Sequence, residues 1–190
     1  MGVALETVFL IVELGLLTAA IFFFMRAAQW FVYGRVDAPF VPTPTRYAHI
    51  VVEALDVRKG DTVYELGSGD GRFVLAYAKC VPDASYIGIE RNPFLHAVAL
   101  VRKRIAGNPP NVEFRRGDFF KADLSGADKI YAYLLTSVMR ELESKFESEF
   151  SGRLASRAFT LAQKEPSSII ALGDRAGAHG QHKLFVYDFE

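Results

Sequence analysis

A glycine-rich turn that joins an apolar run to a helical pattern constrains the fold of this chain more than any other stretch. Thr62 to Leu66 is apolar and β-prone, and glycine then occupies every second position of Gly67-Ser68-Gly69-Asp70-Gly71. A helical pattern starts at Arg72. Glycine carries no Cβ, so a ligand can approach the backbone closely, and a helix start offers unpaired N–H groups and a positive dipole end. The stretch predicts a strand, a ligand-binding loop and a helix at the carboxyl edge of a parallel sheet.

An acidic residue follows this loop at an informative distance. Glu90 directly follows the next predicted strand, Ser85 to Ile89. A carboxylate about 20 residues beyond such a loop can accept hydrogen bonds from both hydroxyls of a ribose. The glycine spacing is G-x-G-x-G, preceded by Glu65. It matches neither the G-x-G-x-x-G dinucleotide fingerprint nor a phosphate-binding P-loop, which disfavours an NAD-binding oxidoreductase.

The rest of the pattern alternates between strands and helices, which predicts an α/β three-layer sandwich with a mostly parallel sheet. A closing antiparallel hairpin is expected from Ser168 to Leu172 and Lys183 to Phe189, around Gly173 to Gly180. The remaining expected elements are helices at Tyr47–Leu55, Arg72–Val81, Pro93–Ala106 and Ser137–Phe150, and strands at Asn111–Phe114, Lys129–Leu135 and Arg153–Phe159.

Four motifs occur in an order that carries a family resemblance. They are Phe40-Val41-Pro42-Thr43-Pro44, Glu65-Leu66-Gly67-Ser68-Gly69-Asp70-Gly71-Arg72, Glu90-Arg91-Asn92-Pro93, and Asp118-Phe119-Phe120-Lys121-Ala122-Asp123-Leu124-Ser125. The chain resembles the class I S-adenosylmethionine-dependent methyltransferases. Within them it is most similar to the membrane-anchored lysine N-methyltransferases that act on the ATP synthase c-subunit. The resemblance runs from about Phe40 to Phe159 and implies a Rossmann-like fold, S-adenosyl-L-methionine as cofactor and a protein substrate at or near the membrane.

The resemblance also implies a set of cofactor-binding residues. In this sequence they are Glu65, Gly67, Ser68, Gly69, Asp70, Gly71, Glu90, Asp118 and Phe119. Glu65 is expected to anchor the loop and the methionine amino group, and Asp118 to accept a hydrogen bond from the adenine amino group while Phe119 packs on the ring. The alternative for the last pair is a turn aspartate followed by a core phenylalanine. The Phe40–Pro44 run either spaces the domain from the membrane or folds over the methionine end of the cofactor.

The chemistry of methyl transfer narrows the candidate catalytic residues. Displacement at a sulfonium needs positioning and electrostatics from the protein, and no metal is expected, since none of the four histidines has ligand-like spacing with cysteine or acids. A lysine nucleophile must lose its proton before attack. Tyr133, near the end of a predicted strand, is the candidate residue that lines the site where this proton leaves. Asp70 is the second candidate catalytic residue.

Two further features bear on the substrate and on competing functions. Tyr133-Leu134-Leu135-Thr136 lacks the Asn/Asp-Pro-Pro-Tyr/Phe motif of many base methyltransferases, and the formal net charge is zero, so no nucleic-acid partner is expected. A G-x-S-x-G elbow is missing, which disfavours a hydrolase. Two alternatives to a lysine methyltransferase stay open: a methyltransferase for a lipid or quinone-like molecule, and a non-catalytic membrane-anchored scaffold.

An apolar stretch near the amino terminus predicts a membrane anchor. Thr7 to Met25 would span roughly 28 Å as a helix, close to the hydrocarbon thickness of a bilayer. Trp30, Phe31 and Tyr33 with Arg26 and Arg35 resemble an interfacial belt, and the positive charge predicts a catalytic domain on the cytoplasmic or organelle-matrix side. We expect an anchor at 1–34, a Pro-rich linker at 35–46 and a methyltransferase domain at 47–190. Cys80 is the only cysteine and is expected to be a buried helix residue.

Overall fold

The computed structural model describes residues 2–33, 41–172 and 182–190. The chain forms two compact units, Met1–Pro39 and Phe40–Glu190. The predicted turn at Gly173–Gly180 and Arg35 of the predicted linker lie outside the described residues.

The described residues of the first unit form one long helix, α1 (Gly2–Tyr33). Within the described residues, Glu6–Arg26 is the one segment long and apolar enough to cross a membrane. None of its most apolar window is buried. Its large apolar side chains, such as Phe24 at 75% exposure, therefore face away from any protein core. The aromatic side chains of the predicted interfacial belt lie outside the described part of the chain.

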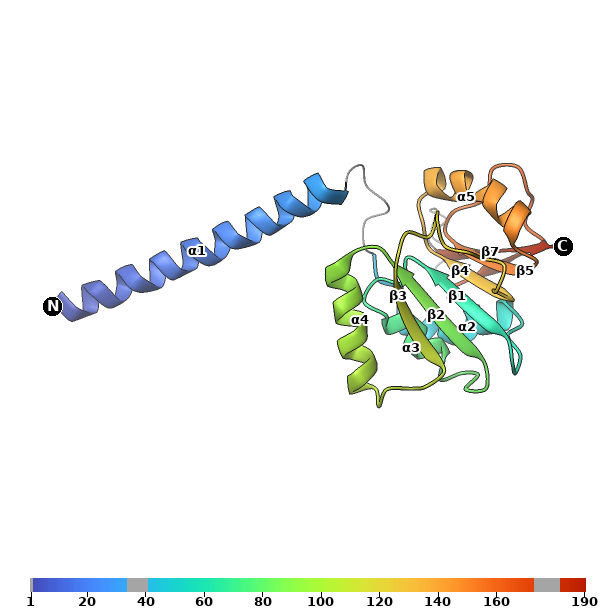
Figure 1. The fold of residues 1–190 in the computed structure, drawn as a ribbon, viewed down its shortest axis with the longest axis horizontal. Helices are drawn as coiled ribbons and strands as arrows, with labels where there is room; N and C mark the ends of the chain where they lie inside the picture. Colours follow the sequence, from blue (N-terminus) through green and yellow to red (C-terminus); the bar gives the residue numbers. More distant parts are fainter. Residues whose placement is uncertain (1, 34–40, 173–181) are drawn as a thin grey trace. The chain divides into compact units, whose positions relative to one another are not determined.

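The second unit is built on a seven-stranded sheet with the order β3-β2-β1-β4-β5-β7-β6 (Figure 1). β1 pairs in parallel with β2 and β4, β2 with β3 and β4 with β5, whereas β7 runs antiparallel to both β5 and β6. The strands are β1 (Thr62–Leu66), β2 (Ser85–Glu90), β3 (Val112–Arg116), β4 (Lys129–Ala132), β5 (Gly152–Arg157), β6 (Ser168–Ala171) and β7 (Lys183–Phe189). The predicted parallel sheet with a closing antiparallel hairpin is confirmed.

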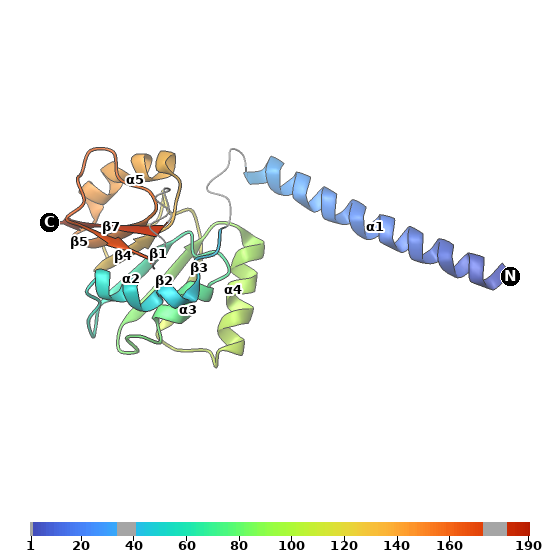
Figure 2. The same cartoon turned by 180° about the vertical axis from the view of Figure 1, so that it is seen from behind.

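Helices cover both faces of this sheet. The second-unit helices are η1 (Thr45–Tyr47), α2 (Ala48–Ala54), α3 (Arg72–Tyr77), α4 (Pro93–Ile105) and α5 (Thr136–Glu149). α2 and α3 lie in front of the sheet in Figure 2, and their buried side chains form one core cluster with Ala99 of α4. α5 packs on the opposite face, where Phe146 contacts Phe189 of β7 with ring centroids 6.0 Å apart. The same strands therefore bury both of their faces, as expected of a three-layer sandwich.

Some element ends differ from the sequence expectation. β4 ends at Ala132 rather than Leu135, so Tyr133 lies in the loop after the strand. α3 ends at Tyr77 rather than Val81, because the chain turns through residues 78–84 before β2. Cys80 lies in this turn and is exposed, so its predicted burial in a helix was wrong.

Candidate active site

The glycine loop after β1 adopts backbone conformations that only glycine tolerates easily. Gly67, Gly69 and Gly71 have φ angles of 76°, 56° and 74°. The amides of Gly67 and Ser68 both donate to the carbonyl of Ile89, which ties the loop to the end of β2. A Cβ on Gly71 would lie 2.5 Å from the ring of Phe114. Glycine is therefore required in this loop both by the left-handed backbone and, at Gly71, by the close contact with Phe114.

Glu90 lies against this loop, as its sequence position predicts. Its Oε2 accepts a hydrogen bond from the amide of Gly69 at 2.8 Å, and its Oε1 accepts one from the amide of Asn92 at 2.7 Å. The residue is 9% exposed. Because two backbone amides fix both oxygens, the carboxylate has a defined direction at the carboxyl end of β2, where open α/β sheets bind ligands.

Two polar side chains at the loop, Ser68 and Glu65, are buried in unusual environments. Ser68 is 5% exposed, and among the described residues its Oγ has no hydrogen-bond partner. Glu65 is 6% exposed and accepts a hydrogen bond of 2.7 Å from the hydroxyl of Tyr77. Burial raises the pKa of Glu65 to about 8, and the negative charges of Asp70 and Glu90 push it in the same direction. Glu65 is therefore mostly protonated at neutral pH.

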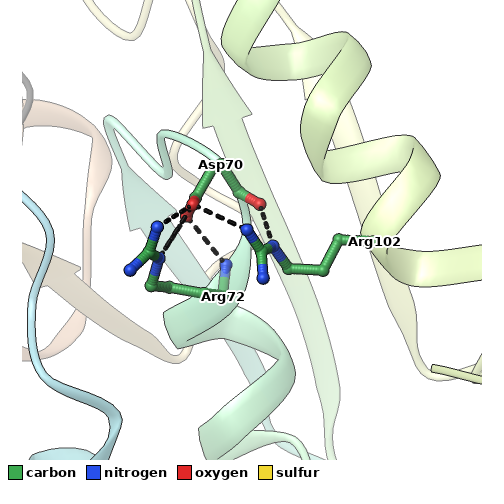
Figure 3. A network of polar contacts seen from close by, with 3 residues as sticks. All are labelled: Asp70, Arg72 and Arg102. Carbon is green, nitrogen blue, oxygen red and sulfur yellow. Dashed lines mark hydrogen bonds and ion pairs between the residues drawn. The ribbon is translucent and has the colours of Figure 1, made fainter. Parts of the chain in front are cut away.

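Asp70 has the opposite electrostatic environment (Figure 3). Arg72 Nε lies 2.9 Å from its Oδ1, and Arg102 Nη2 lies 3.0 Å from its Oδ2. Arg102 Nε also donates to the Asp70 carbonyl at 3.2 Å. Burial alone would raise the pKa of Asp70, but the hydrogen bonds from Arg72 and the charge of Arg102 outweigh it and lower the pKa. The geometry suits ordering of the loop, because both oxygens are already engaged by guanidinium groups.

Arg102 was not expected in this network. Three successive basic residues in the predicted helix Pro93–Ala106, such as Arg102, Lys103 and Arg104, favour a solvated helix face or contact with lipid head groups or an acidic partner. Arg102 instead points from α4 toward the glycine loop (Figure 3). Its contact partner lies 32 residues away in the chain, so no local spacing could have indicated it.

Tyr133 lies at the carboxyl ends of β4 and β5, within an aromatic and cationic cluster. The guanidinium carbon of Arg157 lies 4.5 Å from the centroid of the Tyr133 ring and 5.7 Å from that of Tyr47. Phe159 stacks on the Tyr133 ring with centroids 6.2 Å apart and planes 20° apart. Arg157 is only 6% exposed. Sequence reasoning named Tyr133 but missed Arg157 and Phe159, which the fold brings from the next strand and its following loop.

The Pro-rich segment before η1 packs on the same edge of the sheet. Thr43 is 6% exposed, and its Oγ1 lies 3.3 Å from the hydroxyl of Tyr131 in β4. A cavity of about 340 Å³ lies along this segment, lined by Pro42, Thr43, Pro44, Thr45, Arg46 and Arg72. Arg72 directly follows the glycine loop, so the Pro-rich segment lies next to the point where that loop ends and α3 begins.

Asp118 and Phe119 follow β3, next to the end of β2. Asp118 Oδ1 accepts a hydrogen bond of 3.1 Å from the amide of Phe120, which closes a local turn. Phe119 is 5% exposed, and its ring centroid lies 4.9 Å from that of Phe120. A second cavity, of about 440 Å³, is bordered by Ile89, Gly117 and Asp118 among other residues. Asp118 therefore borders a hollow that Ile89 of β2 and residues after β3 line together.

Comparison of the chain with known proteins identifies its family. The model of the ANTKMT methyltransferase domain matches residues 65–168, more than half of the chain. A "Protein-lysine N-methyltransferase" of Saccharolobus islandicus is 30% identical over 151 residues, which cover 78% of this chain and 92% of the relative. The chain belongs to the ANTKMT methyltransferase family.

Two further matches extend this result. The human lysine N-methyltransferase of the ATP synthase c-subunit is 34% identical over 115 residues, or 60% of this chain, and the match spans about half of that relative, 48%. A crystal structure described as an RNA methyltransferase from Salinibacter ruber, in complex with S-adenosyl-L-homocysteine, aligns with a TM-score of 0.70 and 33% identity. That alignment covers 78% of this chain and 93% of the other. This methyltransferase thus has the class I fold and uses S-adenosyl-L-methionine, and the expected resemblance is confirmed.

The residues at the loop fit this cofactor. A left-handed glycine loop leaves the backbone approachable, and the fixed Glu90 carboxylate lies at the carboxyl end of β2, where open α/β sheets bind ligands. The roles assigned to the individual site residues, Glu90 and Tyr133 included, stay predictions.

Proposed function

We propose that this protein is a membrane-anchored methyltransferase that transfers a methyl group from S-adenosylmethionine to a lysine of a protein at or near the membrane. The observation that carries the proposal is the match to a protein-lysine N-methyltransferase over 92% of that relative's length. The match to the human enzyme named for the ATP synthase c-subunit supports a membrane-protein substrate.

On the cofactor side, the proposed roles follow from the contacts at the loop. The cofactor supplies an electrophilic methyl group on a sulfonium. Glu90 accepts hydrogen bonds from the ribose hydroxyls in the direction that Gly69 and Asn92 fix. Glu65 accepts a hydrogen bond from the ammonium group at the methionine end of the cofactor. Its buried carboxyl ionises when that positive charge approaches. Asp118 and Phe119 hold the adenine.

Asp70 acts in this proposal through the loop. With Arg72 and Arg102 on its oxygens it fixes the path between Gly69 and Gly71. An ionised carboxylate held by two guanidinium groups is a poor proton acceptor, because protonation would break both ion pairs. Asp70 is therefore a positioning residue here.

On the acceptor side, the attacking amine must be neutral. The positive charge of Arg157, 4.5 Å from the Tyr133 ring, disfavours a second positive charge nearby and so lowers the pKa of an entering lysine. The Tyr133 hydroxyl then relays the proton: its oxygen takes the proton of the amine while its own O–H proton passes to water. Phe159 stacks on the Tyr133 ring and the Arg157 guanidinium group lies over it. These two contacts keep the hydroxyl in position.

We further propose that α1 anchors the enzyme in a membrane through Glu6–Arg26, with the catalytic domain on the cytoplasmic or organelle-matrix side. The complete exposure of the apolar window supports an anchor over a core helix. Residues 1–34 form the anchor, 35–46 the linker and 47–190 the methyltransferase domain in this proposal. Within that linker, Thr43 packs against β4, which suits the alternative that the segment also closes one side of the cofactor site.

The decisive experiment follows a labelled methyl group. The full chain, reconstituted in lipid vesicles, is incubated with radiolabelled S-adenosylmethionine and membranes from its own source, and the products are separated into protein, lipid and RNA. We expect label in protein, as methyl-lysine by mass spectrometry, and much less of it with a Glu90→Gln variant when S-adenosylmethionine is not saturating. Label in lipid would support the lipid or quinone alternative, label in RNA an activity like that named for the Salinibacter protein, and no cofactor binding by the folded protein a scaffold.

A further inference from the structure

The solvent-facing side of α4 is apolar. Phe94, Val101 and Ile105 are 60%, 53% and 82% exposed, and Ala97 beside them is also exposed. These residues recur at helical spacing on one side, whereas Ala99 on the other side is fully buried. A surface helix normally turns polar residues outward, so we call this set of four residues the α4 apolar face.

The charged residues of α4 itself are all basic, although Glu113 of β3 lies close enough to Lys103 for their charges to interact. Residues 91–112 contain four basic residues and no aspartate or glutamate, although the whole chain has a formal net charge of zero. Arg102 is committed to Asp70. Arg104 is exposed in the last turn of α4 and Lys103 is partly exposed beside it. An exposed apolar stripe edged by basic residues is the composition of helices that lie in the interface of an anionic bilayer.

We propose that α4 docks the catalytic domain onto an anionic lipid surface, with the α4 apolar face in the interfacial layer and Lys103 and Arg104 at the head groups. Long basic side chains can keep their stems in the apolar layer and their charges in water. The proposal rests on the proposed anchor. Residues 34–40 separate α1 from Val41, and a fully extended chain of that length reaches at most roughly 25 Å. An anchored domain therefore stays within reach of the bilayer.

Docking through α4 would act directly on the cofactor site. α4 begins at Pro93, three residues after Glu90, and the side chain of Asn92 caps it by accepting from the amides of Phe94 and Leu95. Arg102 of the same helix holds the glycine loop through Asp70. An interface-bound α4 thus brings the methyl-transfer site to the level of lysines on short membrane-protein loops. This deepens the proposed function by selecting substrates that lie at the bilayer surface.

The test places an environment-sensitive label on the α4 apolar face of the full chain. A Cys80→Ser protein carries Val101→Cys, and its matched control carries Ser144→Cys, an exposed position on α5. Both are labelled with bimane and reconstituted in phosphatidylcholine vesicles with and without phosphatidylglycerol, and with doxyl-labelled lipid as quencher. Flotation first checks that each protein is in the membrane.

We expect quenching by doxyl lipid at position 101 in vesicles with phosphatidylglycerol, little in phosphatidylcholine alone, and little at position 144 in either. Changing Lys103 and Arg104 to glutamate should weaken docking by about 30-fold or more, because each basic side chain near an anionic surface contributes to binding. Equal quenching in both lipids, or none at position 101, would overturn the proposal. A blue shift of the bimane emission that doxyl lipid does not quench and that increases with protein density would also overturn the proposal. A second copy of the chain would then cover the face. Failure to float would overturn the anchor and the docking together.

Discussion

The buried carboxyl of Glu65 should make the stability of the catalytic domain depend on pH in a specific way. Its pKa is about 8 in the folded protein, whereas glutamate in an unfolded chain titrates near 4.3. The folded state therefore binds the proton more tightly, so its contribution to stability is complete below about pH 4.3 and is lost as pH rises through about 8. Integrated between pH 6 and pH 9, the loss is roughly 3 kcal/mol.

Urea unfolding followed by circular dichroism between pH 6 and pH 9 measures this loss, with the full chain in detergent. The matched variant is Glu65→Gln, which keeps the shape and the hydrogen bond with Tyr77 but cannot ionise. The wild type should lose roughly 3 kcal/mol more than this variant across the range. Other groups titrate equally in both proteins, so the difference isolates Glu65. Parallel pH profiles would refute the assignment of a raised pKa to this residue.

Three further outcomes are expected. Glu90→Gln should weaken S-adenosylmethionine binding about tenfold or more by calorimetry, because hydrogen bonds to a charged acceptor are lost; unchanged affinity would remove Glu90 from the ribose site. Tyr133→Phe should lower kcat for methyl transfer by about 100-fold with the cofactor KM unchanged, and a normal kcat would exclude a proton-transfer role. Gly71→Ala should destabilise the domain by about 2 kcal/mol or more in urea unfolding, because of its φ of 74° and the contact with Phe114, whereas Ser144→Ala should be nearly neutral.

The sequence predicted the parts of the fold that depend on local patterns. The strand at Thr62–Leu66 and the glycine loop formed where expected, and the helix begins at Arg72 as expected, because the apolar run and the glycine spacing are both local signals. The end of that helix was predicted four residues too late. Glu90 was placed at the end of its strand for the same reason. The helix at Pro93 was predicted from Asn92 as a cap, and its side chain does accept from the amides of Phe94 and Leu95.

Contacts between distant segments could not be predicted in this way. Glu143 of α5 is an example, because it looks like any surface helix acid in the sequence. In the fold it is 4% exposed and accepts hydrogen bonds from three successive amides, those of Ala162, Gln163 and Lys164. Arg157 and Arg102 were missed likewise, since charged residues in a sequence do not reveal whether the fold turns them inward.

Glu65 and Asp70 lie five positions apart, yet their surroundings push their pKa values in opposite directions. Glu65 is buried and receives one hydrogen bond, from neutral Tyr77, so it holds its proton near pH 7. Asp70 receives two guanidinium groups and stays ionised. A neutral carboxyl can respond to an arriving cation by ionising, whereas one already paired with two cations has little to gain. In the proposed mechanism the two acids therefore have different roles. Glu65 binds the ammonium group of the cofactor and Asp70 holds the loop, so the proton of the acceptor amine passes through Tyr133 to water.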